Sequence, residues 1–243
     1  MGGIGPPLSI MKRSALAIIT ARGGSKRIPR KNIRSFLGRP ILAYSTEAAR
    51  TSRLFDEVMV SSDDEEILEL GRTLGAATPF KRSAGTSDDA ATTAEVLLEV
   101  LSEYRRRGDE FEYLCCIYPT APFVSAGKLQ QAAALLRDSG ADAVVPVTAF
   151  SFPIWRSFKI EEGRLAFNWP ENALRRSQDL PQAFHDCGQF YFLRTESFLA
   201  QRRLIMDHTV PIIVSEGEAQ DIDTEDDWKI AEIKYSLLLE RQT

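Results

Sequence analysis

A basic, glycine-rich loop follows the first predicted strand of the chain and carries its clearest chemical signal. Gly23 and Gly24 allow a tight backbone turn that presents successive N–H groups to an anion. Arg22, Lys26 and Lys31 add positive charge that suits phosphate oxygens. The spacing fits neither the GxGxxG dinucleotide fingerprint nor the GxxxxGKS/T phosphate loop. We interpret the loop as phosphate-binding, because it lies at the carboxyl end of a strand, with a solvated basic loop as the alternative.

Two carboxylates near the end of the chain, Asp221 and Asp223, are spaced for a divalent cation. Residues two apart in an extended segment face the same side. Mg²⁺ takes one or two carboxylates together with substrate phosphates. Helix capping is the competing interpretation, because Thr224 and Asp227 have the spacing of a capping box. We assign residues 225–227 to the helix start. The role of Asp221 and Asp223 stays open between metal binding and helix capping.

A third polar stretch runs from Arg175 to Gln189. Arg175 and Arg176 could clamp a carboxylate through paired N–H groups, although an ordinary charged surface is favoured if the stretch stands alone. His185 by itself is more typical of a hydrogen-bonded structural histidine than of a base.

Alternating strands and helices are predicted to position these residues. The predicted strands are 15–21, 57–61, 78–80, 113–118 and 143–147. The predicted helices begin at Pro40, at Asp64, at Asp88 or Asp89, and at Ala126. A Ser62–Glu65 capping box is expected to open the second helix, and Ser125 is expected to cap the fourth. This order predicts an α/β fold with a mainly parallel sheet and helices on both faces. Ligands in such sheets bind beyond the carboxyl ends of the strands. The loops after residues 21, 61, 118 and 147 are therefore the places to look for a site.

The pattern changes after Phe150. A β-hairpin is predicted around residues 161–163, followed by strands at 189–193 and 210–214 and a helix at 226–240. The segment 150–181 holds more large apolar side chains than a solvated loop needs, which is typical of a subunit interface.

Composition excludes several classes of protein. The chain has 243 residues and a net charge of −4, which argues against a nucleic-acid partner. No apolar run reaches the roughly 18 residues of a membrane span. The three cysteines include the adjacent Cys115 and Cys116, which face opposite sides of a strand, so reduced buried thiols in a cytoplasmic protein are expected. Residues 1–14 are predicted to be a flexible leader and residues 15–243 a single domain.

Five segments of the chain occur in an order that a known family shares. They are Ala21–Asn32 with Phe36, Gly38 and Pro40, then Val60–Asp63, Tyr118–Pro122, Leu180–Phe184 and Asp221–Asp223. Together they resemble the signature of the cytidylyltransferases that activate acidic nine-carbon sugars, the CMP-N-acylneuraminate (sialic acid) synthetase-like family. The forms Lys26–Asn32 and His185–Tyr191 look more like its pseudaminic acid cytidylyltransferase branch. The sialic acid enzymes usually have Gln in place of Tyr118 and Arg in place of His185, and Cys187 stands where Ala is common.

The resemblance implies a Rossmann-like α/β fold of the nucleotide-diphospho-sugar transferase type. It implies a Mg²⁺-dependent transfer of CMP from CTP to the anomeric hydroxyl of an acidic nine-carbon sugar, with pseudaminic acid as the first candidate and pyrophosphate as the other product. It also implies a homodimer formed by the β-rich insertion at about 150–181.

The resemblance further implies a role for individual residues. The nucleotide is expected to bind Ala21, Arg22, Gly23, Gly24, Ser25, Lys26, Arg82 and Ser87, with Arg22, Lys26, Lys31 and Asn32 acting on the phosphates. The sugar is expected to bind Tyr118, Arg175 or Arg176, His185 and Gln189. Magnesium is expected to bind Asp221 and Asp223.

Alternatives remain within and outside this family. CMP-sialic or CMP-legionaminic acid synthesis is the runner-up, and activation of 3-deoxy-manno-octulosonate fits the stretch from Arg175 to Gln189 less well. A non-catalytic nucleotide-binding regulatory module is a hypothesis from another class, which the retained Arg22, Lys26, Asp221 and Asp223 disfavour. A Rossmann oxidoreductase is disfavoured by the missing GxGxxG.

Overall fold

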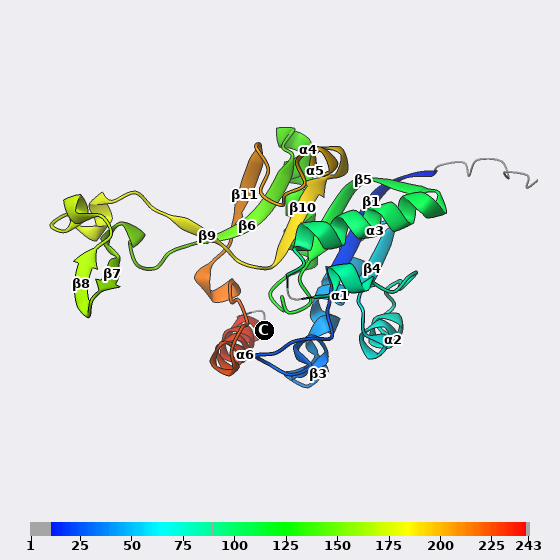
Figure 1. Cartoon of the computed structure of the whole chain (residues 1–243), viewed down its shortest axis with the longest axis horizontal. Coiled ribbons are helices and arrows are strands. Elements are labelled where there is room, and N and C mark those ends of the chain that lie inside the picture. The colour runs from blue at the N-terminus through cyan, green and yellow to red at the C-terminus, as the bar shows by residue number, and fades with distance from the viewer. Residues whose placement is uncertain (1–10, 89, 242–243) are drawn as a thin grey trace, which may run out of the picture.

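A seven-stranded, mainly parallel sheet forms the centre of the computed structural model, which describes residues 11–88 and 90–241 (Figure 1). Along the sheet the order is β11-β6-β10-β5-β1-β4, with β9 paired to β6, and β10 runs antiparallel to both neighbours. The strands are β1 (Met11–Thr20), β4 (Glu57–Ser61), β5 (Asp109–Ile117), β6 (Ala143–Ala149), β9 (Phe184–Asp186), β10 (Phe190–Arg194) and β11 (Thr209–Ile213). The sheet confirms the predicted α/β architecture.

Helices pack on both faces of the sheet. One face carries α1 (Ile41–Ser52), α2 (Glu65–Thr73) and α4 (Ala126–Ser139), and the other carries α3 (Thr93–Arg107) and α5 (Thr195–Gln201). Helix α6 (Glu225–Glu240) packs beside α1, where the Tyr235 ring contacts the Tyr44 ring. Alternate residues of β5 supply the two cores, so Cys115 lies in one and Cys116 in the other. Both thiols are buried and free, as predicted.

Several predicted boundaries are wrong, and local contacts explain each shift. Strand β1 begins at Met11, because residues 11–13 already pair with β5. Those residues therefore belong to the sheet and not to a leader, whose residues 1–10 lie outside the described part. Helix α2 is capped by Asp64, whose carboxylate accepts two backbone N–H bonds, and not by Ser62. Thr92 and Glu95 form the capping box of α3, so this helix begins after Asp88.

Three further elements differ from expectation. An isolated bridge between Ala77 and Met59 replaces the strand predicted at 78–80. Strand β9 and helix α5 were not predicted, since β9 is exposed and α5 has 7 residues, too few for a clear helical period. The antiparallel direction of β10 was also not predicted, because strand direction is not encoded in a short apolar run. The helices in the described part of the chain are too short or too polar to cross a bilayer.

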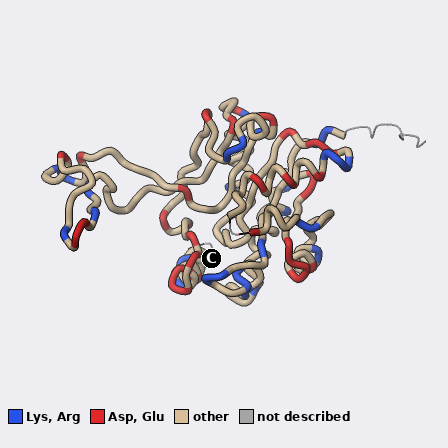
Figure 2. The backbone as a smooth tube through the Cα atoms, in the orientation of Figure 1, with Lys and Arg blue, Asp and Glu red and all other residues tan. Residues whose placement is uncertain are grey.

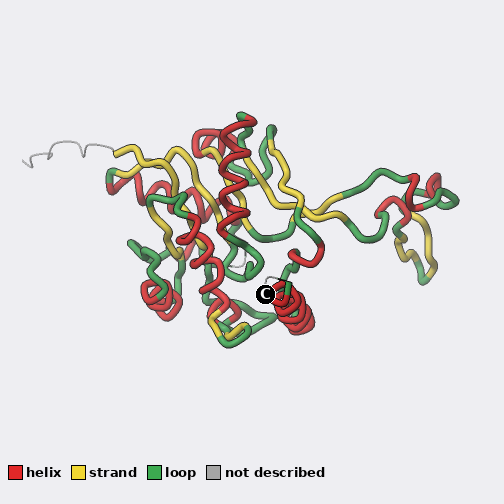
Figure 3. The backbone as a smooth tube through the Cα atoms, turned by 180° about the vertical axis from the view of Figure 1, so that it is seen from behind, coloured by secondary structure: helices red, strands yellow, loops and turns green. Residues whose placement is uncertain are grey.

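Residues 150–181 project from the sheet as an arm (Figures 1 and 3). The arm contains the predicted hairpin, β7 (Phe158–Glu161) paired with β8 (Arg164–Phe167). Glu162 and Gly163 both have positive φ, as a two-residue hairpin turn requires. The small hairpin β2 (Ser35–Phe36) and β3 (Arg39–Pro40) precedes α1, which begins at Ile41, one residue after Pro40.

Candidate functional site

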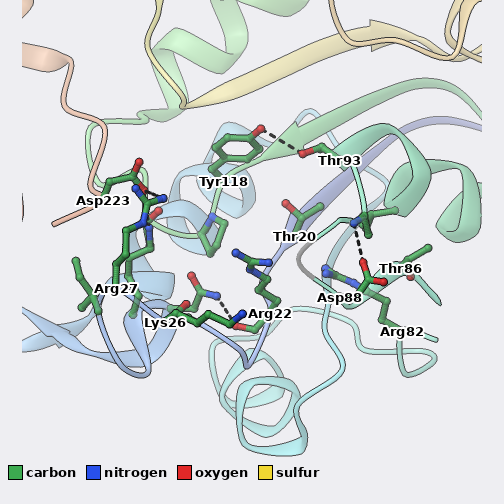
Figure 4. A pocket seen from close by; sticks show the side chains of 18 residues that line it. Thr20, Arg22, Lys26, Arg27, Arg82, Thr86, Asp88, Thr93, Tyr118 and Asp223 are labelled. Carbon is green, nitrogen blue, oxygen red and sulfur yellow. Dashed lines mark hydrogen bonds and ion pairs between the residues drawn. The ribbon is translucent and has the colours of Figure 1, made fainter. Parts of the chain in front are cut away.

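A pocket of about 330 Å³ opens at the carboxyl ends of β1 and β5 (Figure 4). The fold explains its position, because β1, β4 and β5 are parallel and end at the same edge. Eight of the residues predicted for the site line it, namely Arg22, Ser25, Lys26, Lys31, Asn32, Arg82, Tyr118 and Asp223. The structure therefore brings the basic loop and one acidic residue from the end of the chain into one cavity.

The basic loop is held by side chains from two directions. The buried Asn32 amide donates to the Arg22 carbonyl at 2.7 Å, which closes the loop on itself. The Gly23 N–H donates to the Asp63 carboxylate at 3.0 Å. It is therefore not presented to an anion in the pocket, which differs from the prediction. Neither Gly23 nor Gly24 has a positive φ. A Cβ on Gly23 would lie 2.8 Å from an Asp64 carboxylate oxygen, so this glycine is needed for a close approach and not for a tight turn.

Substituting Gly23 by Ala should therefore destabilise the protein by about 1–3 kcal/mol, since the added methyl group overpacks against Asp64. Gly24→Ala is the matched control, because a Cβ there meets nothing within 4 Å. Urea unfolding of both variants measures the difference. Equal stabilities of the two variants would show that the Asp64 side chain shifts to accommodate the methyl group without a measurable cost.

The basic loop meets the acidic residues that precede α6. Arg27 pairs with Asp223 at 2.9 Å, and the Lys31 ammonium lies 3.6 Å from the same carboxylate. Lys31 also donates to the Ile222 carbonyl at 2.5 Å. Figure 2 shows Lys/Arg segments of the early chain beside the acidic start of α6. Opposite charges from the two ends of the sequence thus face each other at the pocket.

Asp221 and Asp223 fit the donor set of a magnesium ion that also binds substrate phosphates. Capping is done by Thr224 and Asp227, which form the predicted capping box, so the first two carboxylates are not needed for it. Burial and the negative charge of Asp223 raise the pKa of Asp221, and a bound cation would offset both effects. The described residues contain no group of three or more potential metal ligands, so a magnesium ion held by these two carboxylates would need further oxygen ligands from substrate or water.

Arg82 is buried at the pocket wall. Its guanidinium donates to the Ser61 carbonyl at 2.5 Å and to the Ser61 hydroxyl at 3.1 Å, and burial lowers its pKa. Ser87, expected to bind the nucleotide, does not line the pocket, and its hydroxyl donates to the Ser83 carbonyl. Its neighbours Thr86 and Asp88 line the pocket instead.

Four residues predicted to bind the sugar are not part of this pocket in the described chain. Arg175 and Arg176 lie on the arm, where both bind Asp179. The His185 ring packs on Phe150 with centroids 4.7 Å apart. Gln189 is buried, and its amide donates to the Glu218 carbonyl at 2.6 Å. Its place inside the core, and not at a surface, could not be inferred from its polar side chain.

The pocket also contains residues that the sequence analysis missed. They are Thr20, Arg27, Ile28, Thr86, Asp88, Ala91, Thr93, Val96, Pro119 and Thr120. Thr20 ends β1, so its place at the carboxyl edge of the sheet is a signal in the sequence that could have identified it as a pocket residue. Pro119 and Thr120 belong to a motif that was recognised without giving them a role. The loop before α3 was missed because the helix was expected to begin near Asp88.

Comparison with known proteins gives a consistent picture. The family model described as cytidylyltransferase matches residues 16–211. The chain is 39% identical over 223 residues to the pseudaminic acid cytidylyltransferase of Campylobacter jejuni, covering 91% of this chain and 96% of that protein. It is 26% identical to the CMP-N,N'-diacetyllegionaminic acid synthase of Legionella pneumophila, covering 89% of this chain and 94% of that protein.

A solved structure shares the fold. The CMP:2-keto-3-deoxy-manno-octonic acid synthetase complexed with CTP aligns with a TM-score of 0.67 at 17% identity, covering 94% of this chain and all of that one (100%).

Proposed function

The chain belongs to the cytidylyltransferase family, and on that premise we propose that it transfers CMP from CTP to an acidic nine-carbon sugar and releases pyrophosphate. Pseudaminic acid is the first candidate for the sugar, supported by the 39% identity to an enzyme of that name. The observation that carries the proposal is the pocket in which Arg22, Lys26, Lys31 and Asp223 converge.

The reaction we propose is an in-line displacement. The anomeric hydroxyl of the sugar attacks the α-phosphorus of CTP, the bond to the β-phosphate oxygen breaks, and pyrophosphate leaves. Such transfers need positioning and charge neutralisation more than covalent help from the protein. Arg22 and Lys26 hold the triphosphate, and Lys31 covers it from the side of Asp223. Arg82, fixed on Ser61, supports the wall that faces the cytidine.

We assign magnesium to Asp221 and Asp223. A bound magnesium ion supplies Lewis-acid stabilisation of phosphate oxygens. Asp221 and Asp223 would hold the ion, and the contact of Lys31 with the Ile222 carbonyl fixes the segment between them. Binding there would exchange the Arg27–Asp223 ion pair for a metal contact and release the Arg27 side chain toward the pocket.

The arm supports the proposal of a homodimer. Four of its large apolar side chains are 69–99% exposed, and they are Phe152, Ile160, Leu165 and Leu174. A patch of this kind is typical of a subunit interface. Because Arg175 and Arg176 lie on the same arm, we assign any contact they make with a sugar carboxylate to the arm of a second copy.

Introducing Asp at Ile160 and Leu174 together should convert the dimer to a monomer, since each charge would have to be buried at the interface. Light scattering at micromolar concentration measures the mass. Leu239→Asp is the control, because Leu239 is an exposed leucine that lies on α6, away from the arm. A wild-type monomer, or a variant that stays dimeric, contradicts the assignment.

The function is tested by pyrophosphate release from CTP and Mg²⁺ in the presence of pseudaminic, legionaminic, sialic or 3-deoxy-manno-octulosonic acid. Release that depends on a nine-carbon acid supports the proposal, and the largest kcat/KM identifies the sugar. If the protein binds CTP but releases no pyrophosphate with any of these acids, the regulatory module is favoured and the enzyme proposal is wrong.

A further inference from the structure

The loop of residues 82–88 forms one wall of the pocket. Arg82, Thr86 and Asp88 line the cavity, and Figure 4 shows them together on one side of it. Arg27 and Asp223, where phosphate and metal are proposed to meet, lie on the other side. The wall loop therefore faces the end of the pocket that is left for the nucleoside part of CTP.

Glu99 of α3 binds the wall loop at three points and does not itself line the pocket. One carboxylate oxygen accepts the Ser83 N–H at 2.8 Å. The other accepts the Ser83 hydroxyl at 3.0 Å and also the Thr86 hydroxyl. The two bonded residues stand before and at the end of the single-turn helix η2 (Ala84–Thr86), so one carboxylate spans the whole turn.

The Glu99 carboxylate is suited to this task by its charge. Burial raises its pKa, but the hydrogen bonds from Thr86 and Ser83 and the positive charge of Arg82 outweigh burial, so the pKa is lowered. An ionised carboxylate accepts stronger hydrogen bonds than a neutral group. The wall loop is thus held by charge-assisted bonds at η2, while the bonds from Arg82 to Ser61 hold its other end.

We propose that Glu99 is a positioning residue that keeps the wall loop in the conformation that receives the nucleoside part of CTP. The proposal rests on the proposed function, in which CTP binds this pocket. A loop that is ordered before binding loses little conformational freedom when the ligand arrives, which increases affinity. The negative charge of Asp88 on the same loop disfavours phosphate there, so the nucleoside suits this wall better than the triphosphate does.

The first test is Glu99→Gln, which keeps the length of the side chain but replaces one accepting oxygen by an NH₂ group that faces donors. We expect the Kd for CTP, measured by titration calorimetry, to rise about tenfold, and the Kd for pyrophosphate to change less than about twofold. In turnover the KM for CTP should rise, while kcat and the KM for the sugar acid stay within about twofold, because only ground-state binding of the nucleotide is lost. Glu103→Gln is the matched control, since it is the same change one turn later on α3, where the carboxylate pairs with Arg106.

The second test acts from the side of the loop. Ser83→Ala removes one of the bonded hydroxyls, and Ser83 does not line the pocket. We expect a rise of about threefold in the Kd for CTP, and a double variant with Glu99→Gln whose effect is smaller than the product of the two single effects. Independent effects of the two changes would show that Glu99 does not act through the loop.

Hydrogen exchange gives a readout that does not depend on affinity. The backbone amides of residues 82–88 should exchange faster in free Glu99→Gln than in the free wild-type protein, and CTP should restore their protection. Unchanged exchange in the free variant would mean that the loop is ordered without Glu99.

The outcomes separate this proposal from the proposed function. A wild-type protein that binds CTP without turnover contradicts the function alone, since the Kd is measured without turnover. A Glu99→Gln variant with the wild-type Kd for CTP contradicts the positioning role, even if its thermal stability falls. Equal rises in the Kd for CTP and for pyrophosphate also overturn the proposal, because the wall loop would then act on the phosphates. If Glu99→Gln fails to fold, the Kd of Ser83→Ala for CTP decides, and a wild-type value contradicts the proposal.

Discussion

Replacing Asp223 by Asn should lower kcat by roughly a hundredfold to a thousandfold, the effect of losing several kcal/mol of transition-state charge stabilisation. Asp223 lines the pocket and lies within reach of Arg27 and Lys31, so its charge is placed where phosphate and magnesium would meet. The amide keeps the shape of the side chain but binds Mg²⁺ more weakly. Steady-state pyrophosphate release over a range of Mg²⁺ concentrations measures both kcat and the apparent metal affinity.

The matched control is Asp226→Asn, the same chemical change three residues later. Asp226 pairs with Lys229 on the exposed surface of α6 and does not line the pocket. Its kcat should stay within about twofold of wild type, since exposed ion pairs contribute little. The Asp223 side chain is 38% exposed, so thermal unfolding of the Asp223→Asn variant should change little. Near-normal turnover in that variant would place the metal elsewhere.

The parts of the fold that were predicted correctly depend on local signals. Strand β4 and helix α4 have the expected bounds, because a short β-branched run and a Ser125 cap with Gly140 mark them clearly. The Thr224–Asp227 capping box was also correct. The basic loop was placed correctly because the carboxyl end of a buried parallel strand dictates where its following loop lies.

The parts that were missed depend on contacts between distant residues. Gly23 is required by Asp64, 41 positions later, and Gln189 is buried against Glu218, so neither role is visible in its own neighbourhood. The arm was predicted as an apolar excursion. That it carries Arg175 and Arg176 away from the pocket follows from the geometry of its two connections to the sheet, β6 and β9 (Figure 1). Sequence patterning gives which face is buried but not where a projecting segment points.

The second large effect is expected for Lys31→Met, because the Lys31 ammonium joins the two halves of the site. It binds the Ile222 carbonyl at 2.5 Å, lies 3.6 Å from Asp223, and its side chain is 19% exposed. Losing it would remove the proposed phosphate contact and leave the segment of Asp221 and Asp223 without its anchor. The Coulomb cost is larger for such a partly buried charge than for a surface one.

We expect kcat/KM for CTP to fall roughly a hundredfold in this variant, in line with the loss of one charge-assisted contact and the misplacement of a second group. Lys229→Met is the control, since Lys229 is exposed and pairs with Asp226. The decisive measurement is the Mg²⁺ dependence. If Lys31 orders the carboxylates, the variant will need more Mg²⁺ for half-maximal activity at saturating CTP. If Lys31 only binds phosphate, the KM for CTP will change and the Mg²⁺ concentration for half-maximal activity at saturating CTP will not.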